Sequence, residues 1–168
     1  MYTSKNTSVN STRPAAIYSY VGFEMDGKHV LDYGCGRYPE VCKKAAYSYY
    51  AATWTGYDPY WKPQSLRYRV FDIVLCANVL NVIRDKRELE ACIESCLRMV
   101  DVGGKAVFQI YEGDRTGEGR ETKPDCWQRN ERTQAYADRI YLSKAFEPCG
   151  MSIKVYKNYI VVTDEAPF

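Results

Sequence analysis

The hydrophobic positions of this chain alternate between short continuous runs and helical spacing. The clearest run is Phe71-Asp-Ile-Val-Leu-Cys-Ala77, which is typical of a strand buried on both faces. Residues 86–100 instead place apolar side chains at 89, 93, 97 and 100 with charges between them, so they predict an amphipathic helix. The pair Gly103-Gly104 is expected to end that helix, and Lys105 to Tyr111 to form the following strand.

Other parts of the chain continue this succession of strands and helices. Asp26-Gly27 predicts a turn that leads into a short buried strand around Val30 and Leu31. Lys157-Asn158 separates two short runs of strand-forming residues, which is the signature of a hairpin. The remaining expected elements are helices at 14–23, 40–52 and 135–146 and strands at 53–58, 152–156 and 159–163.

Two segments fall outside this pattern. Residues 1–13 are polar and rich in Ser, Thr and Asn, so we expect a mobile tail followed by a single domain over 14–168. Residues 112–134 form a polar connection that is long for a compact domain, and such connections are usually functional or disordered.

Three neighbouring side chains in that connection carry candidate chemistry. Trp127 supplies a flat ring, Gln128 an amide and Arg129 a fixed cation, a set that suits a planar or anionic substrate. An exposed Trp also commonly docks on its own domain, so substrate contact and a plain loop remain open alternatives.

A glycine turn follows the first strand and identifies the most informative stretch. Gly34 and Gly36 allow the backbone to turn closely against a ligand, and Asp32 stands two residues before them. A dinucleotide site would place pyrophosphate here, which a neighbouring carboxylate opposes, and Pro39 stands where the third glycine of that fingerprint belongs. An acid at this point suits a ligand with a positive amino group, such as S-adenosylmethionine.

The segment Leu31-Asp-Tyr-Gly-Cys-Gly36 resembles the first motif of the class I S-adenosylmethionine-dependent methyltransferases, apolar-Leu-Asp-x-Gly-x-Gly-x-Gly. It departs from that motif at the third glycine, where Tyr38 stands. Together with Gly-Tyr-Asp-Pro-Tyr-Trp-Lys-Pro at 56–63 and Val-Leu-Asn-Val-Ile at 79–83, it is similar to small stand-alone bacterial and phage methyltransferase-like proteins, some of them associated with DNA modification.

The resemblance implies an α/β fold with a doubly wound, mostly parallel, Rossmann-like sheet and a C-terminal antiparallel hairpin. Only about a dozen residues separate Asp58 from Phe71, too few for the helix and strand that a complete methyltransferase has there. We therefore expect a sheet that is abbreviated in the middle, with six or seven strands.

Asp58 is the second acid of interest. It lies 22 residues after Gly36, close to the spacing at which an acid binds a ribose in such folds, although a turn with a surface acid is the alternative. The cofactor-binding residues that the resemblance implies are Asp32, Gly34, Cys35 and Gly36 for the methionine end, Asp58 for the ribose, Pro59 and Tyr60 beside the adenine, and Asn78 near the donor.

The composition of the chain limits the classes of protein that it can belong to, but it assigns few properties directly. The chain has 168 residues, enough for one domain, and its 46% hydrophobic and 26% charged residues are those of an ordinary globular protein. A net charge of +2 neither requires nor excludes nucleic acid as a partner. Neither a signal peptide nor a membrane-spanning run is present in the sequence, so we expect a cytoplasmic protein.

The seven cysteines favour free thiols over a disulfide framework. Their number is odd, and no Cys-x-x-Cys pair occurs among them. Cys92 and Cys96 share one face of the expected helix, but no adjacent His or Cys pair completes a metal site. A reduced protein without a metal is therefore expected.

The chemistry of the acceptor is less defined than that of the donor. A sulfonium donor carries its own reactivity, so a general base is needed only if the acceptor must lose a proton. The only histidine, His29, starts a strand and is expected to be structural, which leaves the catalytic residue unknown. The chain also lacks the Asp/Asn-Pro-Pro-aromatic and Pro-Cys motifs of DNA base methylases at the corresponding position, which disfavours those reactions.

The sequence thus predicts a methyltransferase that uses S-adenosylmethionine and acts on an unidentified acceptor, either a nucleic acid or a small molecule. The alternative is a non-catalytic S-adenosylmethionine-binding protein or accessory subunit with the same fold. A nicotinamide-dependent enzyme is a third class, which Asp32 and Pro39 both oppose. The oligomeric state has no signature in the sequence.

Overall fold

A computed structural model describes residues 4–6, 12–110, 118–124, 126–129, 132–142 and 150–165. Within them the chain forms a six-stranded sheet in the order β2-β1-β3-β4-β8-β7 and a separate β5-β6 hairpin. The first four strands along the chain run parallel, and β8 pairs antiparallel with both β4 and β7. The strands are β1 His29–Tyr33, β2 Thr53–Tyr57, β3 Phe71–Ala77, β4 Val100–Gln109, β5 Gly119–Lys123, β6 Cys126–Arg129, β7 Met151–Val155 and β8 Tyr159–Asp164. The expected fold class is confirmed.

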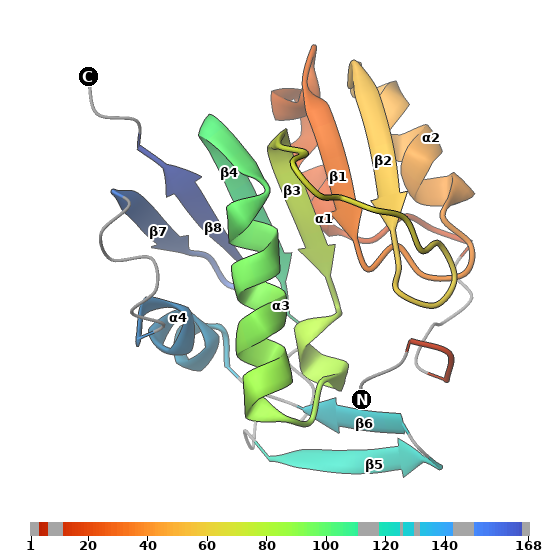
Figure 1. The fold of residues 1–168 in the computed structure, drawn as a ribbon, viewed down its shortest axis with the longest axis vertical. Helices are drawn as coiled ribbons and strands as arrows, with labels where there is room; N and C mark the ends of the chain where they lie inside the picture. Colours follow the sequence, from red (N-terminus) through yellow and green to blue (C-terminus); the bar gives the residue numbers. More distant parts are fainter. Residues whose placement is uncertain are drawn as a thin grey trace.

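Helices cover both faces of the sheet (Figure 1). Helices α3 (Lys86–Arg98) and α4 (Thr133–Leu142) contribute to one apolar core, and α1 (Ile17–Val21) and α2 (Glu40–Ser48) contribute to the other. The 3-10 helix η1 (Gly22–Met25) continues α1. Among the described residues, no helix combines the length and the apolar character that crossing a membrane requires.

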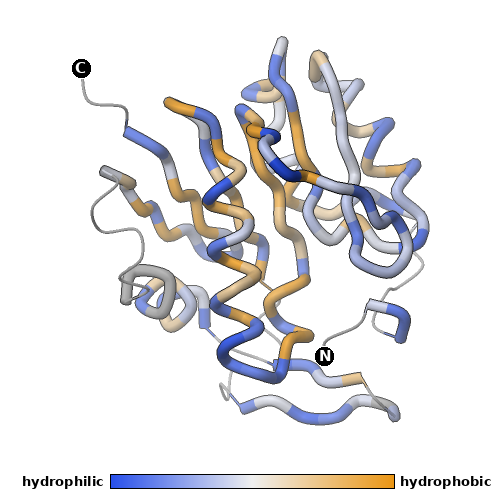
Figure 2. The backbone as a smooth tube through the Cα atoms, in the orientation of Figure 1, coloured by the Kyte–Doolittle hydropathy of each residue, from blue (hydrophilic) through white to orange (hydrophobic). Residues whose placement is uncertain are grey.

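Strand β3 divides these two cores because its side chains alternate between the faces. Val74 and Cys76 pack in the core beneath α3, whereas Ile73 and Leu75 pack in the core beneath α1 and α2. All four are almost completely buried, and β3 is one of the most hydrophobic parts of the backbone in Figure 2. A strand with apolar side chains on both faces requires helices on both sides, as the continuous run predicts.

The expected shortening lies at the β2 edge of the sheet. Among the described residues, β2 pairs with β1 alone, so its other side has no neighbouring strand. The Gln64 amide donates to the Gly56 carbonyl at 2.5 Å, and the Arg69 guanidinium donates to Thr55 Oγ1 at 3.1 Å. Side chains of the connecting segment thus satisfy and shield part of an edge that would otherwise be open.

The expected position of Gly103-Gly104 was wrong. Helix α3 ends at Arg98 and β4 begins at Val100, so both glycines lie inside the strand. The pairing of β3 with β4 passes from Phe71 opposite Val100 to Ile73 opposite Lys105, and Gly103 has φ 75° in this bulge. A glycine with positive φ serves a bulge as well as a helix end, so local sequence does not separate the two.

The polar connection at 112–134 was also only partly anticipated, because it contains the β5-β6 hairpin and the start of α4. The helix expected at 40–52 is shorter, ending at Ser48, and part of the helix expected at 135–146 lies outside the described residues. The terminal hairpin is confirmed, with each strand within about a residue of its expected bounds. Most of the tail at 1–13 lies outside the described residues, and its mobility stays a prediction.

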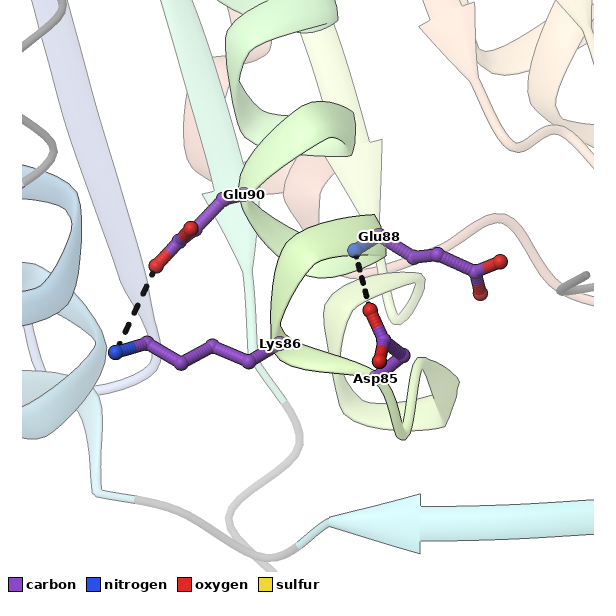
Figure 3. Close-up of polar contacts among 4 residues, drawn as sticks. All are labelled: Asp85, Lys86, Glu88 and Glu90. Atoms are coloured by element: carbon purple, nitrogen blue, oxygen red, sulfur yellow. Dashed lines mark hydrogen bonds and ion pairs between the residues drawn. The ribbon is translucent and has the colours of Figure 1, made fainter.

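Helix α3 begins at an N-cap that its sequence specifies (Figure 3). Asp85 has extended backbone angles, and its carboxylate accepts a hydrogen bond of 2.9 Å from the Glu88 backbone N–H. At the first residue of the helix, the Lys86 ammonium lies 3.8 Å from the Glu90 carboxylate in an exposed i, i+4 pair. The cap satisfies a backbone donor that the helix cannot, whereas the ion pair is screened by water.

This difference gives a direct test of what fixes α3. Replacing Asp85 by Ala should lower the free energy of unfolding by about 1 kcal/mol, because the N-cap bond is lost. Glu90→Ala, the matched control on the same helix, should change it by less than about 0.5 kcal/mol. Urea denaturation followed by circular dichroism measures both, and equal losses in the two variants would contradict the importance of the cap.

Candidate functional site

A cavity of about 690 Å³ opens where the carboxyl ends of β1, β2 and β3 meet. The register brings these ends together, since Asp32 is opposite Gly56 on one side and Leu75 on the other. Nine residues singled out from the sequence line the cavity: Asp32, Gly34, Cys35, Gly36, Asp58, Pro59, Asn78, Trp127 and Gln128. Open α/β sheets bind their ligands at this edge.

The glycine turn forms one wall and is held in place by β2. The backbone N–H groups of Gly34 and Cys35 both donate to the Tyr57 carbonyl, at 2.7 and 3.0 Å. Gly34 has φ 90°, and a Cβ added to it would lie 2.3 Å from Val79 Cγ2. The first glycine is therefore required both by its backbone angle and by the close approach of the segment after β3.

Asp32 lies at the base of the cavity in a chain of buried hydrogen bonds. It is 4% exposed, and its Oδ2 accepts from the Tyr18 hydroxyl at 2.6 Å, while Trp54 Nε1 donates to that hydroxyl at 2.8 Å. Burial raises the pKa of Asp32 from 3.8 to about 6, although the Tyr18 bond acts in the opposite direction. Burial and the neighbouring Asp32 charge raise the pKa of Tyr18 well above its usual value, so its hydroxyl remains a donor.

Asp58 follows β2 and is 2% exposed. Its Oδ1 accepts from the backbone N–H groups of Tyr60 and Trp61, each at 2.9 Å, and from the Ser4 hydroxyl. The turn after β2 thus fixes the carboxylate at the cavity, and a hydroxyl group already meets it there.

Asn78 follows β3 with φ 57°, a left-handed conformation that Asn tolerates better than most residues. Its backbone N–H donates to the Gln109 carbonyl at 3.1 Å, and its Oδ1 accepts from the Gln109 side-chain amide at 3.3 Å. The same Gln109 side chain accepts from the Ile17 backbone N–H at 2.7 Å. Gln109 therefore connects the end of β3 to the start of α1.

The β5-β6 hairpin forms the opposite wall. Trp127, Gln128 and Thr122 line the cavity from it, and the Arg84 guanidinium lies 4.7 Å from the centre of the Trp127 ring. The Cys126 thiol donates to the Asn6 carbonyl, so the described part of the N-terminal segment lies between this hairpin and Asp58. Figure 1 shows the hairpin beyond the carboxyl ends of the parallel strands.

Two expected site residues lie elsewhere. Tyr60 is not part of the cavity wall, and its ring packs edge-on against Trp61 with a centroid separation of 4.8 Å. The Arg129 guanidinium donates to the backbone carbonyls of Ile83 and Arg84, at 3.2 and 3.0 Å, and so joins the hairpin to the loop before α3. Tyr38, which replaces the third glycine, does line the cavity.

Several side chains that shape the site have no signal in the sequence, including Ser4, Tyr18 and Trp54. Asn81 is another: it lies in the 3-10 helix η2 (Leu80–Val82), lines the cavity and is 4% exposed. Within the described residues, its Oδ1 has no hydrogen-bond partner. The resemblance at 79–83 is the only sequence signal near Asn81, and it does not distinguish this polar side chain from its apolar neighbours.

Among the described residues, the cavity wall contains no histidine, lysine or glutamate. The ionisable groups that line it in the described part of the chain are Arg13, the two aspartates, tyrosines and cysteines. Burial, followed by the Asp32 charge, raises the pKa of Cys42 to about 11 and that of Cys35 still further. Both thiols are therefore neutral near pH 7, and neither is an activated nucleophile.

No family model and no curated protein matches this chain. Solved structures do match. The chain is similar to a 1,6-didemethyltoxoflavin-N1-methyltransferase of Burkholderia thailandensis, solved with 1,6-didemethyltoxoflavin and S-adenosylhomocysteine bound. The TM-score is 0.67 at 12% identity, over 89% of this chain and 77% of that one.

Two more matches have lower scores. One is CalS10, an amino pentose methyltransferase from Micromonospora echinaspora with S-adenosylmethionine bound, at TM-score 0.60 and 14% identity over 88% of each chain. The other is an O-methyltransferase family protein from Burkholderia thailandensis, at TM-score 0.53 and 11% identity over 89% of this chain. This chain spans about half, 54%, of the latter's length. The matches establish the fold: this chain folds as the S-adenosylmethionine-dependent methyltransferases do.

Proposed function

We propose that this chain is a methyltransferase that takes its methyl group from S-adenosylmethionine and transfers it to a small acceptor. The observation that carries the proposal is the convergence of Asp32, the glycine turn and Asp58 on one cavity at the ligand-binding edge of this fold. The structural matches support the donor, since two of those proteins were solved with S-adenosylmethionine or S-adenosylhomocysteine bound.

In the proposed complex, Asp58 binds the ribose of the donor. Three donors already converge on Oδ1, one of them the Ser4 hydroxyl, which demonstrates that this carboxylate can accept from an O–H group. A bidentate carboxylate suits the two neighbouring hydroxyls of a ribose. Pro59 lies beside Asp58 on the cavity wall and would border the adenine, whereas Tyr60 would act through its backbone N–H.

The methionine end of the donor would lie over the glycine turn. Gly34 and Gly36 keep side chains away from it, with Cys35 as a neutral neighbour, and Asp32 provides a negative charge for the amino group. Asn78 lies at the adjacent strand end, close to where the sulfonium would face the acceptor. Transfer forms a bond from the methyl carbon to the acceptor as the carbon–sulfur bond breaks, which leaves a neutral thioether.

The acceptor would enter between η2 and the β5-β6 hairpin. The described lining there comes from uncharged side chains, namely Val79, Asn81, Val82, Ile83, Thr122, Trp127 and Gln128. With no activated base among them, the acceptor must be nucleophilic as it stands, as a neutral amine or ring nitrogen is. Within the described residues Asn81 Oδ1 has no partner, so it would accept a hydrogen bond from the N–H of an amine acceptor.

Donor binding is the first test. Isothermal titration calorimetry with S-adenosylhomocysteine should show binding to the wild type and affinity at least about tenfold weaker in Asp58→Ala, because the ribose loses its acceptor. Asp138→Ala removes an exposed acid on α4, away from the cavity, and should leave affinity unchanged. A wild-type protein that does not bind the ligand would remove the proposal.

Affinity for the donor should also depend on pH through Asp32. Its pKa of about 6 means that the free carboxylate is ionised at pH 7.5 and mostly protonated at pH 5. A positive amino group favours the ionised form, so affinity should be highest near pH 7 and fall by up to about tenfold per pH unit below pH 6. Asp32→Asn should bind more weakly at pH 7.5 and lose most of this pH dependence, which titrations at four pH values would measure.

Turnover distinguishes an enzyme from a donor-binding protein. Labelled S-adenosylmethionine incubated with the protein and a small-molecule extract should give a labelled product that Asp58→Ala forms poorly. Donor binding without transfer to small-molecule, protein or nucleic-acid fractions would support the non-catalytic alternative. Label that is released only by nuclease digestion would instead identify a nucleic-acid acceptor.

A further inference from the structure

Three cysteines from two elements converge beneath α3. The Sγ atoms of Cys76, Cys92 and Cys96 all lie within 4.8 Å of one another. Cys92 and Cys96 are one turn apart on α3, and Cys76 faces them from β3, in the same apolar core. Helical spacing predicts the pair on α3, but it does not predict the third thiol, because that contact joins two separate elements.

The spacing suits three sulfurs around one ion. Thiolate sulfurs that lie 2.3 Å from a common centre are about 4 Å apart, so small rotations about χ1 would bring these thiols into a shared coordination shell. Thiolates prefer soft, thiophilic ions. Within the described residues, no fourth Cys and no His, Asp or Glu joins the cluster.

The cluster is buried but accessible from the cavity. Cys76 and Cys96 are fully buried, whereas Cys92 is 9% exposed and lines the cavity wall. An ion that enters the cavity would therefore meet Cys92 first and could then reach the two thiols behind it. Such an entry path is a requirement of a usable metal site.

The charge of the surroundings selects among thiophilic ions. In the described part of the chain the buried ionisable side chains apart from cysteines and tyrosines are Asp32 and Asp58, and no Lys, Arg or His is buried. Three thiolates give a complex of charge −1 with Zn²⁺ and −2 with Cu⁺, both costly in an apolar core without a cation. A trivalent ion gives a neutral complex and needs no fourth ligand.

We propose that Cys76, Cys92 and Cys96 form a binding site for a trivalent thiophilic ion of the arsenite type, which is held as a neutral three-coordinate tris-thiolate. Binding is a condensation without oxidation or reduction. Arsenous acid, As(OH)₃, loses its three hydroxyl groups, each of which leaves as water with one thiol proton, while three As–S bonds form. This proposal does not rest on the proposed methyl transfer, although Cys92 lines the same cavity.

Arsenite itself is the probe for the test. Native mass spectrometry of the folded protein should show one arsenic per chain, with loss of three thiol protons, and X-ray absorption should show three sulfur neighbours. Arsenite at about a hundred times its dissociation constant should raise Tm by roughly 5 °C or more, because only the folded chain holds the three thiols together. Each of Cys76→Ala, Cys92→Ala and Cys96→Ala should weaken binding at least tenfold.

Cys126→Ala is the matched control, since Cys126 is a buried thiol outside the cluster. It should keep the stoichiometry, the three sulfur neighbours and the Tm shift. Circular dichroism and a cooperative melt identify which of the cluster variants remain folded. Only the folded variants are used to compare arsenite affinity with that of the wild type. The proposal is overturned if the wild type shows no arsenic adduct with three sulfur neighbours. A larger Tm increase with Zn²⁺ or Cu⁺ than with arsenite would overturn the assignment to a trivalent ion.

Discussion

The backbone carbonyl of Tyr57 links the two sides of the candidate site. It accepts hydrogen bonds from both Gly34 and Cys35, so the turn after β1 is attached to the end of β2. Asp58 is the next residue along the chain, and its position is consequently coupled to that of the glycine turn. On the other side of the turn, Val79 closes against Gly34, which couples the end of β3 to the same point. The site is therefore one mechanical unit formed by three strand ends.

The two acids of this unit are held differently, and the difference follows from what surrounds each. Asp58 accepts backbone N–H bonds that come from its own turn, so its placement is local. Asp32 instead depends on the Tyr18 hydroxyl, contributed by a helix on one face of the sheet, and on Trp54 behind it. Because burial disfavours the ionised form of Asp32, a bound cation would stabilise this carboxylate as much as the carboxylate stabilises the cation.

Local sequence predicted the parts of the fold and site that depend on one element. The apolar run of β3, the glycine turn and the spacing to Asp58 can all be read within a few tens of residues. The hydrogen bonds from Tyr18 to Asp32 and from Ser4 to Asp58 cannot be predicted from local sequence, since each joins residues that only the folded sheet brings together. The β5-β6 hairpin was missed because Arg120 and Glu121 give its first strand no apolar alternation, so periodicity carries no signal there.

The cysteine cluster is another contact between separate elements that local sequence does not predict, and it lies next to the candidate site. Strand periodicity places Cys76 and Val74 on one face, and helical periodicity places Cys92 beside Cys96, but the register between β3 and α3 is not encoded in either period. Cys76 is two residues before Asn78, and Cys92 lines the cavity itself. A ligand shared by these thiols would tie α3 to β3 directly behind the strand end that bears Asn78. The packing of α3 against β3 and the shape of the cavity are therefore coupled, and a ligand that changes the position of the helix should also change the cavity wall at Cys92.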